Sequence, residues 1–225
     1  MTEDLKMNPK SAISTLVFCV TAVVILAFGC GEDPAYKPQP FGDPPLSFKN
    51  LQNKDDILFN LELAYNKRDF EEFEKLLDDD FVFILSESDY NSGEVDAPQW
   101  DRVRELSVNQ QIFDPNLDSG LRVISIDLSL DYSAGNWTPL PPDTNHPTET
   151  WYTQTVGYDL ITKTADDWEH RALDLNAQLT VRKNDSTGLW QIVLWRDDVG
   201  SQMGLSPGRI AVESTTWGGI KAQYE

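Results

Sequence analysis

The chain has 225 residues, a length that suits one domain with additional segments. Hydrophobic residues make up 40% and aromatic residues 11%, which is enough for a packed core and excludes a disordered acidic chain. The net charge of −19, with no basic stripe to offset it, excludes nucleic-acid binding because an acidic surface repels phosphate. Anionic lipid is repelled in the same way, so membrane attachment requires a separate device.

The N-terminus carries the pattern of an export signal. Residues 11–29 form an apolar run without charge, and Lys6 and Lys10 precede it. Cys30 follows this run directly, and the segment resembles the lipobox of bacterial lipoproteins. We expect residues 1–29 to be removed as a lipoprotein signal peptide and Cys30 to carry the lipid. The alternative is an uncleaved anchor, since roughly 18 apolar residues nearly span a bilayer.

Export would place the domain on the periplasmic or cell-surface side of a bacterial envelope. Of the two cysteines, Cys19 lies inside the expected leader and Cys30 at its end, so the exported domain has no thiol pair. Residues 30–47 follow as a proline-rich tether, which extends by about 3.1 Å per residue. The membrane is therefore the first expected partner, through the N-terminal lipid.

Helical spacing begins after the tether. Residues 50–68 place apolar side chains three and four positions apart, which predicts a helix. Asp69 begins a second helix, because Glu72 completes a capping box, and the aspartate run 78–80 ends it. A third helix is expected over residues 98–111, since proline suits the first turn.

Strand patterns alternate with and then follow the helices. Residues 81–85 are wholly apolar and predict a buried strand between the second and third helices. Apolar residues then recur at every second position, the period of a half-buried strand. The strands predicted in this way are 120–132, 151–164, 168–183 and 189–198, with a proline-rich loop over 134–150. This order of elements predicts an α+β fold.

Two stretches of this order carry a family resemblance. Residues 58–83 read LFNLELAYNKRDFEEFEKLLDDDFVF, and residues 188–198 read GLWQIVLWRDD. They resemble the nuclear transport factor 2-like superfamily, which includes the SnoaL-like polyketide cyclases. The resemblance implies a domain over residues 48–198 with a cone-shaped, strongly curved, mostly antiparallel sheet, wrapped by about three N-terminal helices around a pocket. Residues 199–225 remain as a C-terminal extension. Such a fold does not choose a function.

Strand alternation selects candidate residues to line a pocket. Tyr152, Gln154 and Tyr158 share one face of their strand, and Arg196 shares the parity of apolar residues on the last strand. We expect Arg196 to point inward, where its fork of donors suits a carboxylate, and Trp100 to cap the same space. The alternative is that Arg196 pairs with an aspartate at the rim and that the aromatic residues are ordinary core.

Motifs for catalysis and metal binding fail in this sequence. The GxSxG match at 204–208 places Pro207 where a backbone N–H must bind an oxyanion. The near match to a calcium loop at 114–125 lacks its final glutamate, and the sequence offers no zinc ligand set. His146 lies in the proline-rich loop, and His170 opposes the leucine row of its strand, which predicts the outer face. We expect no catalytic residue, metal or cofactor.

The missing catalytic chemistry and the tether together predict a non-catalytic module that binds a small ligand or an envelope protein. One alternative is a SnoaL-like isomerase, hydratase or cyclase that uses a pocket carboxylate, with Arg196 holding an anionic substrate. Another is a dimeric envelope scaffold, a homodimer formed through the sheet. A fully buried Asp or Glu in the pocket would favour the enzyme, and a pocket filled by Phe, Leu and Trp the module. A large exposed apolar patch on the sheet would favour the scaffold.

Overall fold

The computed structural model describes residues 46–92, 97–132, 136–141, 148–197 and 216–224. The chain divides into two units, residues 1–45 and 46–225, and all described residues belong to the second. The expected signal peptide, Cys30 and most of the tether lie outside the described residues. Within the described ranges, every helix is too short or too polar to cross a membrane.

Side-chain caps fix where three of the described helices begin, at Asp69, Asp101 and Thr216. The described helices are α2 (Asp56–Lys67), α3 (Phe70–Leu76), α4 (Glu87–Ser92), α5 (Arg102–Phe113) and α6 (Trp217–Ala222). The predicted cap of the second helix is confirmed, because the Asp69 carboxylate accepts from the Glu72 N–H at 3.1 Å. The first helix ends at Lys67, and its C-cap residue Arg68 is left-handed at φ 53°.

Two predicted boundaries were wrong. The aspartates at 78–80 do not end a helix, because strand β1 (Leu77–Ile84) begins directly after α3 and contains them. The third helix does not start at Pro98: residues Gln99–Asp101 pair with β1 as strand β2, and Asp101 then caps α5 by accepting from the Arg104 N–H at 2.9 Å. Sheet pairing overrides the local preference of proline for a first helical turn.

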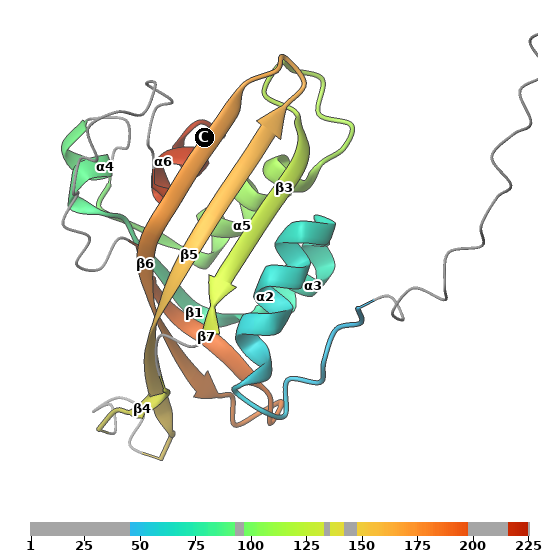
Figure 1. Cartoon of the computed structure of the whole chain (residues 1–225). Coiled ribbons are helices and arrows are strands. Elements are labelled where there is room, and N and C mark those ends of the chain that lie inside the picture. The colour runs from blue at the N-terminus through green and yellow to red at the C-terminus, as the bar shows by residue number, and fades with distance from the viewer. Residues whose placement is uncertain (1–45, 93–96, 133–135, 142–147, 198–215, 225) are drawn as a thin grey trace, which may run out of the picture. The chain divides into compact units, whose positions relative to one another are not determined.

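One sheet runs through the whole domain. Its further strands are β3 (Val123–Asp131), β4 (Thr138–Pro139), β5 (Trp151–Thr164), β6 (Glu169–Lys183) and β7 (Trp190–Arg196). The order is β2-β1-β7-β6-β5-β3, with β4 on β5, and every pairing except β1 with β7 is antiparallel. Figure 1 shows β5 and β6 bending along their length, with α2, α3 and α5 on one face. The predicted α+β fold with a curved, mostly antiparallel sheet is confirmed.

β-Bulges in β6 and β7 reverse the alternation of these strands. In β6 the extra residue lies at Asp174, whose φ is 57°, between the pairs Tyr158–Leu175 and Leu160–Ala172. In β7 Val193 is the extra residue, because Leu194 pairs with Thr180 and Ile192 with Val181. Because side chains alternate with a period of two, each extra residue moves the following side chains to the opposite face.

Side chains of α2 cover the backbone of β3, which is the edge strand of the sheet. The Asn66 amide donates to the Leu128 carbonyl at 2.9 Å and accepts from the Leu128 N–H at 2.7 Å. Glu62 accepts from the Leu130 N–H at 3.1 Å and from the Tyr132 hydroxyl at 2.6 Å. Hydrogen bonds of this kind occupy edge groups that could otherwise pair with another chain.

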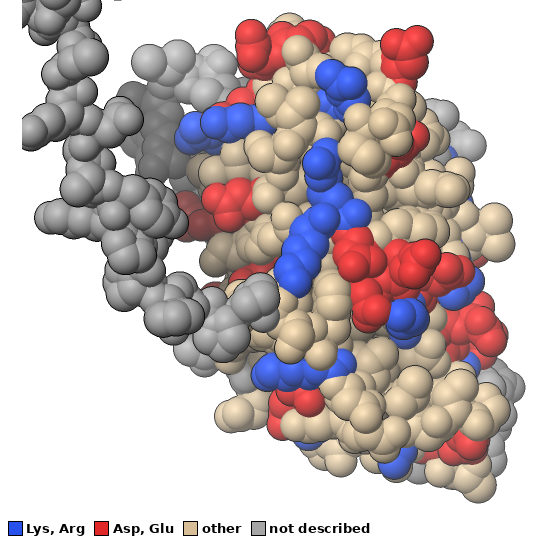
Figure 2. Space-filling model, turned by 90° about the vertical axis from the view of Figure 1, so that its right-hand side faces the viewer, with Lys and Arg blue, Asp and Glu red and all other residues tan. Residues whose placement is uncertain are grey.

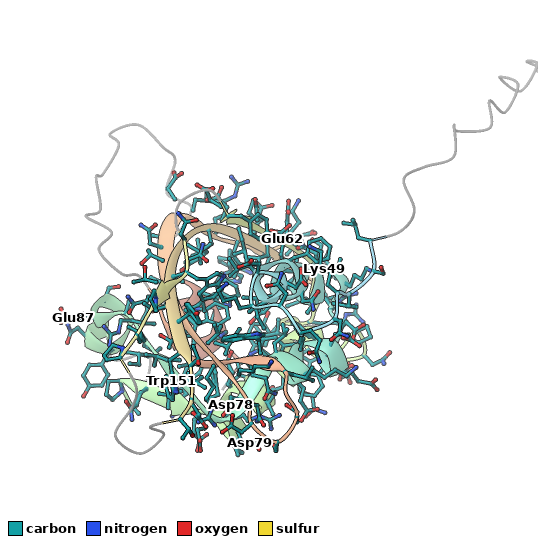
Figure 3. The ribbon with its side chains drawn as sticks, turned by 90° about the horizontal axis from the view of Figure 1, so that it is seen from below. Lys49, Glu62, Asp78, Asp79, Glu87 and Trp151 are labelled. Atoms are coloured by element: carbon teal, nitrogen blue, oxygen red, sulfur yellow. The ribbon has the colours of Figure 1, made fainter. Side chains whose placement is uncertain are left out.

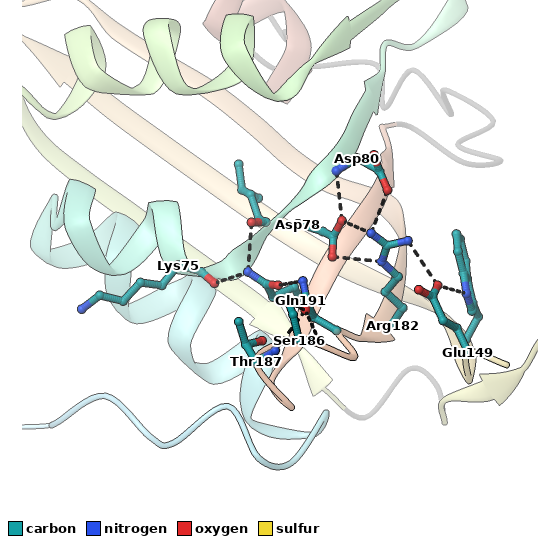
Figure 4. Close-up of polar contacts among 11 residues, drawn as sticks. Lys75, Asp78, Asp80, Glu149, Arg182, Ser186, Thr187 and Gln191 are labelled. Atoms are coloured by element: carbon teal, nitrogen blue, oxygen red, sulfur yellow. Dashed lines mark hydrogen bonds and ion pairs between the residues drawn. The ribbon is translucent and has the colours of Figure 1, made fainter. Parts of the chain in front are cut away.

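A buried arginine joins β6 to β1 on the outer face of the sheet. Arg182, with 7% of its side chain exposed, donates to Asp78 at 2.5 and 2.9 Å and to Asp80 at 2.8 Å (Figure 4). Its third partner is Glu149 at 3.2 Å, which also accepts from the Trp151 indole at 3.1 Å. The aspartates that were expected to end a helix therefore neutralise this guanidinium.

Figure 3 shows how these two polar regions lie. Seen from below, Glu62 and Lys49 lie on the side of α2, while Asp78 and Trp151 lie on the opposite side of the domain. The interior of the domain contains aromatic rings together with buried polar groups, and it receives the C-terminal helix.

Candidate functional site

Helix α6 occupies the concave interior of the domain, close to α5 (Figure 1). It comes from the C-terminal extension, for which the sequence predicted no role. The Trp217 ring is 1% exposed and lies edge-on to three aromatic rings, with centroid distances of 4.3 Å to Trp195, 4.9 Å to Tyr65 and 5.1 Å to Tyr158. Such edge-to-face contacts are favourable beyond the area that they bury. The interior of this structure is therefore filled by the protein's own indole.

Lys221 brings a positive charge into the same interior. Its Nζ is 2.5 Å from Oε1 of Glu105, and both side chains are fully buried. The ammonium also lies over the rings of Phe83 and Trp195, at 4.0 and 4.8 Å from their centroids. Burial lowers the pKa of Lys221, and the negative charge of Glu105 opposes this shift. A desolvated cation is held here by one carboxylate and the faces of aromatic rings.

A chain of hydrogen bonds connects this ion pair to the aromatic cluster. The Asn109 amide donates to Oε1 of Glu105 at 2.9 Å, and its oxygen accepts from the Tyr65 hydroxyl at 2.6 Å. The same hydroxyl accepts from the Trp217 indole N–H at 3.3 Å. Burial raises the pKa of Tyr65, and the charge of Glu105 raises it further. Tyr65 therefore remains a neutral hydroxyl that links both ends of the helix's buried face.

Asp197, directly after β7, binds the start of α6. Its Oδ2 accepts from the Gly218 N–H at 2.7 Å, and its Oδ1 accepts from the Tyr158 hydroxyl at 2.6 Å. Burial raises the pKa of this carboxyl to about 6, against the opposing effect of these two hydrogen bonds. The nearby charge of Asp89 adds to the increase. A carboxyl that titrates near neutral pH therefore supports the helix.

The short helix α4 supplies another carboxylate to α6. The Thr216 hydroxyl donates to Asp89 of α4 and also accepts from the Gly219 N–H at 3.0 Å, so it caps α6. Gly218 lies so close that an added Cβ would be 2.8 Å from Oδ2 of Asp89 and 3.1 Å from Leu85. Any larger residue here would push aside the Asp89 and Leu85 side chains.

The residues predicted to line a pocket are separated in the structure. Tyr152, Gln154 and Tyr158 share the inner face of β5, yet Tyr158 contacts α6 while Gln154 lines a surface hollow of about 410 Å³ with Lys54 and Tyr132. Tyr152 packs against Trp190 at 5.6 Å. Trp100 is fully buried in β2, 5.5 Å from Phe83, so it is core rather than a cap over open space.

The expected orientations of Arg196 and His170 were wrong, both because of a bulge. Val193 shifts β7 by one residue, so Trp195 points into the core and Arg196 is exposed on the outer face. The bulge at Asp174 places His170 on the side of the buried Ala172, where its Nδ1 lies 3.4 Å from the Gln223 amide after α6. Arg196 is therefore not placed to hold an anionic substrate in the interior.

Sequence reasoning missed Glu105, Asp197, Asp89 and Lys221 as residues of the interior. Glycine at 218 followed a tryptophan in a segment without clear periodicity, so no pattern indicated a buried helix. Among the described residues, no group of three or more His, Cys, Asp or Glu could hold a metal ion. His146, Pro207 and the rest of the GxSxG match lie outside the described residues.

Charges on the α2 and α3 side of the domain are mixed. Lys49 pairs with Asp56 at 3.1 Å and Lys75 with Glu72 at 2.6 Å. Figure 2 shows basic and acidic side chains interspersed over this face. Because no single sign dominates there, this view offers no extended field that would steer a charged ligand.

No protein-family model and no curated protein matches the sequence. Similar solved structures include a nuclear transport factor 2-like superfamily protein from Salmonella enterica serovar Typhimurium, with 12% identity, 71% of this chain and 96% of that chain covered and a TM-score of 0.42. A ketosteroid isomerase-like protein from Erwinia carotovora atroseptica has 12% identity, with 63% of this chain and 88% of that chain covered and a TM-score of 0.42. ActVI-ORFA from Streptomyces coelicolor has 14% identity, with 63% of this chain and 90% of that chain covered and a TM-score of 0.39.

Replacing the buried indole should destabilise the domain. We expect Trp217→Ala to lower the free energy of unfolding by about 3–5 kcal/mol, because it leaves a cavity among three aromatic rings. The matched control is Trp168→Ala, which removes an indole that is 62% exposed and should change stability by less than about 0.5 kcal/mol. Urea unfolding measures both. Equal midpoints for wild type and Trp217→Ala would show that α6 is not packed as described.

Asp197 should make the stability depend on pH. Folding raises its pKa from 3.8 to about 6. The stability that Asp197 contributes is therefore fully present below pH 3.8 and is lost as the pH rises through 6. Asn cannot titrate, so the free energy of unfolding of Asp197→Asn relative to wild type should rise between about pH 4 and 7, by on the order of 3 kcal/mol. Urea unfolding at several pH values measures the difference. A difference that stays constant with pH contradicts the assignment.

Proposed function

We propose that this chain is a lipid-tethered binding protein whose single domain acts without catalysis, holding a small ligand or a short protein segment in its concave interior. The observation that carries the proposal is the occupation of this interior by α6, which inserts Trp217 and Lys221 among aromatic rings. The interior contains both aromatic rings, which were expected to favour a binding module, and buried carboxylates, which were expected to favour an enzyme. What those carboxylates bind therefore decides between the two.

Each of the three buried carboxylates around α6 binds a group of that helix or of its cap. Glu105 accepts from the Lys221 ammonium, Asp197 from the Gly218 N–H and Asp89 from the Thr216 hydroxyl. A carboxylate bonded in this way holds a segment in place and is not positioned against a substrate atom. This use of the carboxylates supports a binding role.

A peptide of residues 214–225 tests the proposal in trans. We expect it to bind a Trp217→Ala chain at least about tenfold more tightly than wild type, because the wild-type interior already contains a tethered copy of the same segment. Fluorescence anisotropy of the labelled peptide measures this binding. A Trp168→Ala chain, altered only at an exposed indole, is the control and should behave as wild type.

The peptide itself has a matched control, in which alanine replaces Trp217 and which should not bind. The short-segment form of the proposal fails if the peptide binds neither chain. The enzyme is tested by asking whether the full chain isomerises a β,γ-unsaturated ketone at a rate that Asp197→Asn abolishes. That result would select the alternative function.

The alternative is an acid–base enzyme, a small isomerase, hydratase or cyclase. One pair of residues favours it: the Tyr158 hydroxyl donates to Asp197 at 2.6 Å, and burial raises the pKa of Asp197 to about 6, near the value that suits a general base. Trp217 occupies the space beside Tyr158, so this chemistry would require α6 to leave. The scaffold alternative has less support, since Ser125, Asp127 and Ser129 make most of the exposed side of β3 polar, with Ile124 as its exposed apolar residue.

The location is part of the proposal. A lipid on Cys30 would hold the domain at the periplasmic or cell-surface side of a bacterial envelope, and an apolar leader over residues 11–29 supports export. Lipid attachment through one cysteine gives a membrane anchor that the acidic body, with its net charge of −19, does not provide by itself.

Replacing the lipidated cysteine tests the anchor. We expect Cys30→Ser to move the protein from the membrane fraction to the soluble fraction, because the thioether to the lipid cannot form. Cell fractionation and immunoblotting measure the distribution. Cys19→Ser is the control, since Cys19 lies within the expected leader and its loss should leave the protein in the membrane fraction. A Cys30→Ser protein that remains with the membrane would indicate an uncleaved anchor instead.

A further inference from the structure

We infer that the concave interior is a binding site for an arylalkylammonium, a ligand that joins an aromatic ring to an amino group through a short chain. The inference rests on the proposed binding function and names its ligand class. In the structure, α6 itself supplies both halves of such a ligand: the Trp217 ring and the Lys221 ammonium.

The ammonium half lies in a cage of rings closed by one carboxylate. Nζ of Lys221 is 4.0 Å from the centroid of Phe83, 4.8 Å from that of Trp195 and 2.5 Å from Oε1 of Glu105. Phe83 and Trp195 belong to strands β1 and β7, and Glu105 to α5, so this cage is formed without α6. Ring faces and a carboxylate together favour a desolvated cation.

The lysine does not satisfy every group of the cage. Among the described residues, Oε2 of Glu105 is buried and has no hydrogen-bond partner. A buried carboxylate oxygen without a donor is unfavourable, and a primary ammonium carries three donors. Lys221 is fixed to a helix whose start is held at Gly218, whereas a free amine can settle between both carboxylate oxygens.

The aromatic half lies one helical turn away. Trp217 and Lys221 are four residues apart, so their side chains project from the same face of α6. The Trp217 ring is enclosed by Tyr65, Tyr158 and Trp195, of which Trp195 also contacts the Lys221 ammonium. Because both halves share one ring wall, a ligand with a chain of a few carbons between ring and amine spans the two positions.

Helix α6 is an occupant that a ligand can replace. It has six residues, adds no strand to the sheet, and is held by its cap, by side chains and by the hydrogen bond from Gly218 to Asp197. A covalently tethered occupant competes at high effective concentration. A free ligand should therefore bind the wild-type chain more weakly than a chain whose built-in ammonium has been removed.

The experiment uses the full chain with Lys221→Ala and n-butylammonium chloride as the probe. We expect the amine to raise the thermal unfolding midpoint of this variant, with an apparent Kd at least about tenfold lower than for wild type. The neutral isostere 1-butanol should give no comparable shift, and adding Glu105→Gln should abolish the effect of the amine. Lys183→Ala, which removes an exposed lysine of β6, is the matched control.

The ring half is tested in a second chain. With Trp217→Ala added to Lys221→Ala, phenethylammonium should bind about tenfold more tightly than n-butylammonium, because its ring takes the place of the indole. If Lys221→Ala does not fold, Lys221→Met keeps the apolar chain and methylammonium becomes the probe for the carboxylate. Equal affinity of the two amines for the double variant would overturn the aromatic half of the inference.

The outcomes separate this inference from the proposed function. Equal shifts with the amine and the alcohol, or an amine effect that survives Glu105→Gln, overturn the ammonium site. If the peptide of residues 214–225 still binds the Trp217→Ala chain in that case, the binding function stands and only the ligand class is wrong. If neither the peptide nor any amine binds any variant, both fail.

Discussion

The closed interior depends on one buried ion pair. Glu105 and Lys221 are both fully buried, and neither charge could remain in this apolar space without the other. The pair therefore requires α6 to be in place, and the position of α6 in turn determines where Trp217 lies among Tyr65 and the other rings. Asn109 extends the pair toward Tyr65, so the polar groups of the interior form one connected network.

The shape that receives α6 comes from irregularities in the sheet. Strands of 14 and 15 residues curve here with the help of bulges, and the same bulges select which side chains point inward. The bulge at Val193 turns Trp195 toward the core and Arg196 toward solvent. The bulge at Asp174 leaves Ala172 buried and Asp174 itself exposed. Curvature and the chemistry of the interior therefore have a common cause.

The interior shows why a list of residue types does not assign a function. Tyr158 hydrogen-bonded to a buried Asp197 is a pair that could transfer protons, yet here it binds the backbone of Gly218. A carboxylate beside aromatic rings likewise suits either a substrate or a bound cation. The occupancy of the space by α6 supports the proposed binding role, and the aromatic cage around Lys221 supports the proposed ligand class.

The sequence by itself determined the periodic elements: helical spacing before Lys67, the Asp69 cap, and the alternation that places Tyr158 on the inner face of β5. These features depend on neighbours within a few residues, which local patterns record. Only the tertiary structure decided the direction of Arg196 and the role of residues 216–224. A single extra residue reverses a strand's alternation without a signature in composition, and Lys221 meets Glu105 across 116 positions of chain. A contact over that separation arises from the fold, because nothing near either residue specifies it.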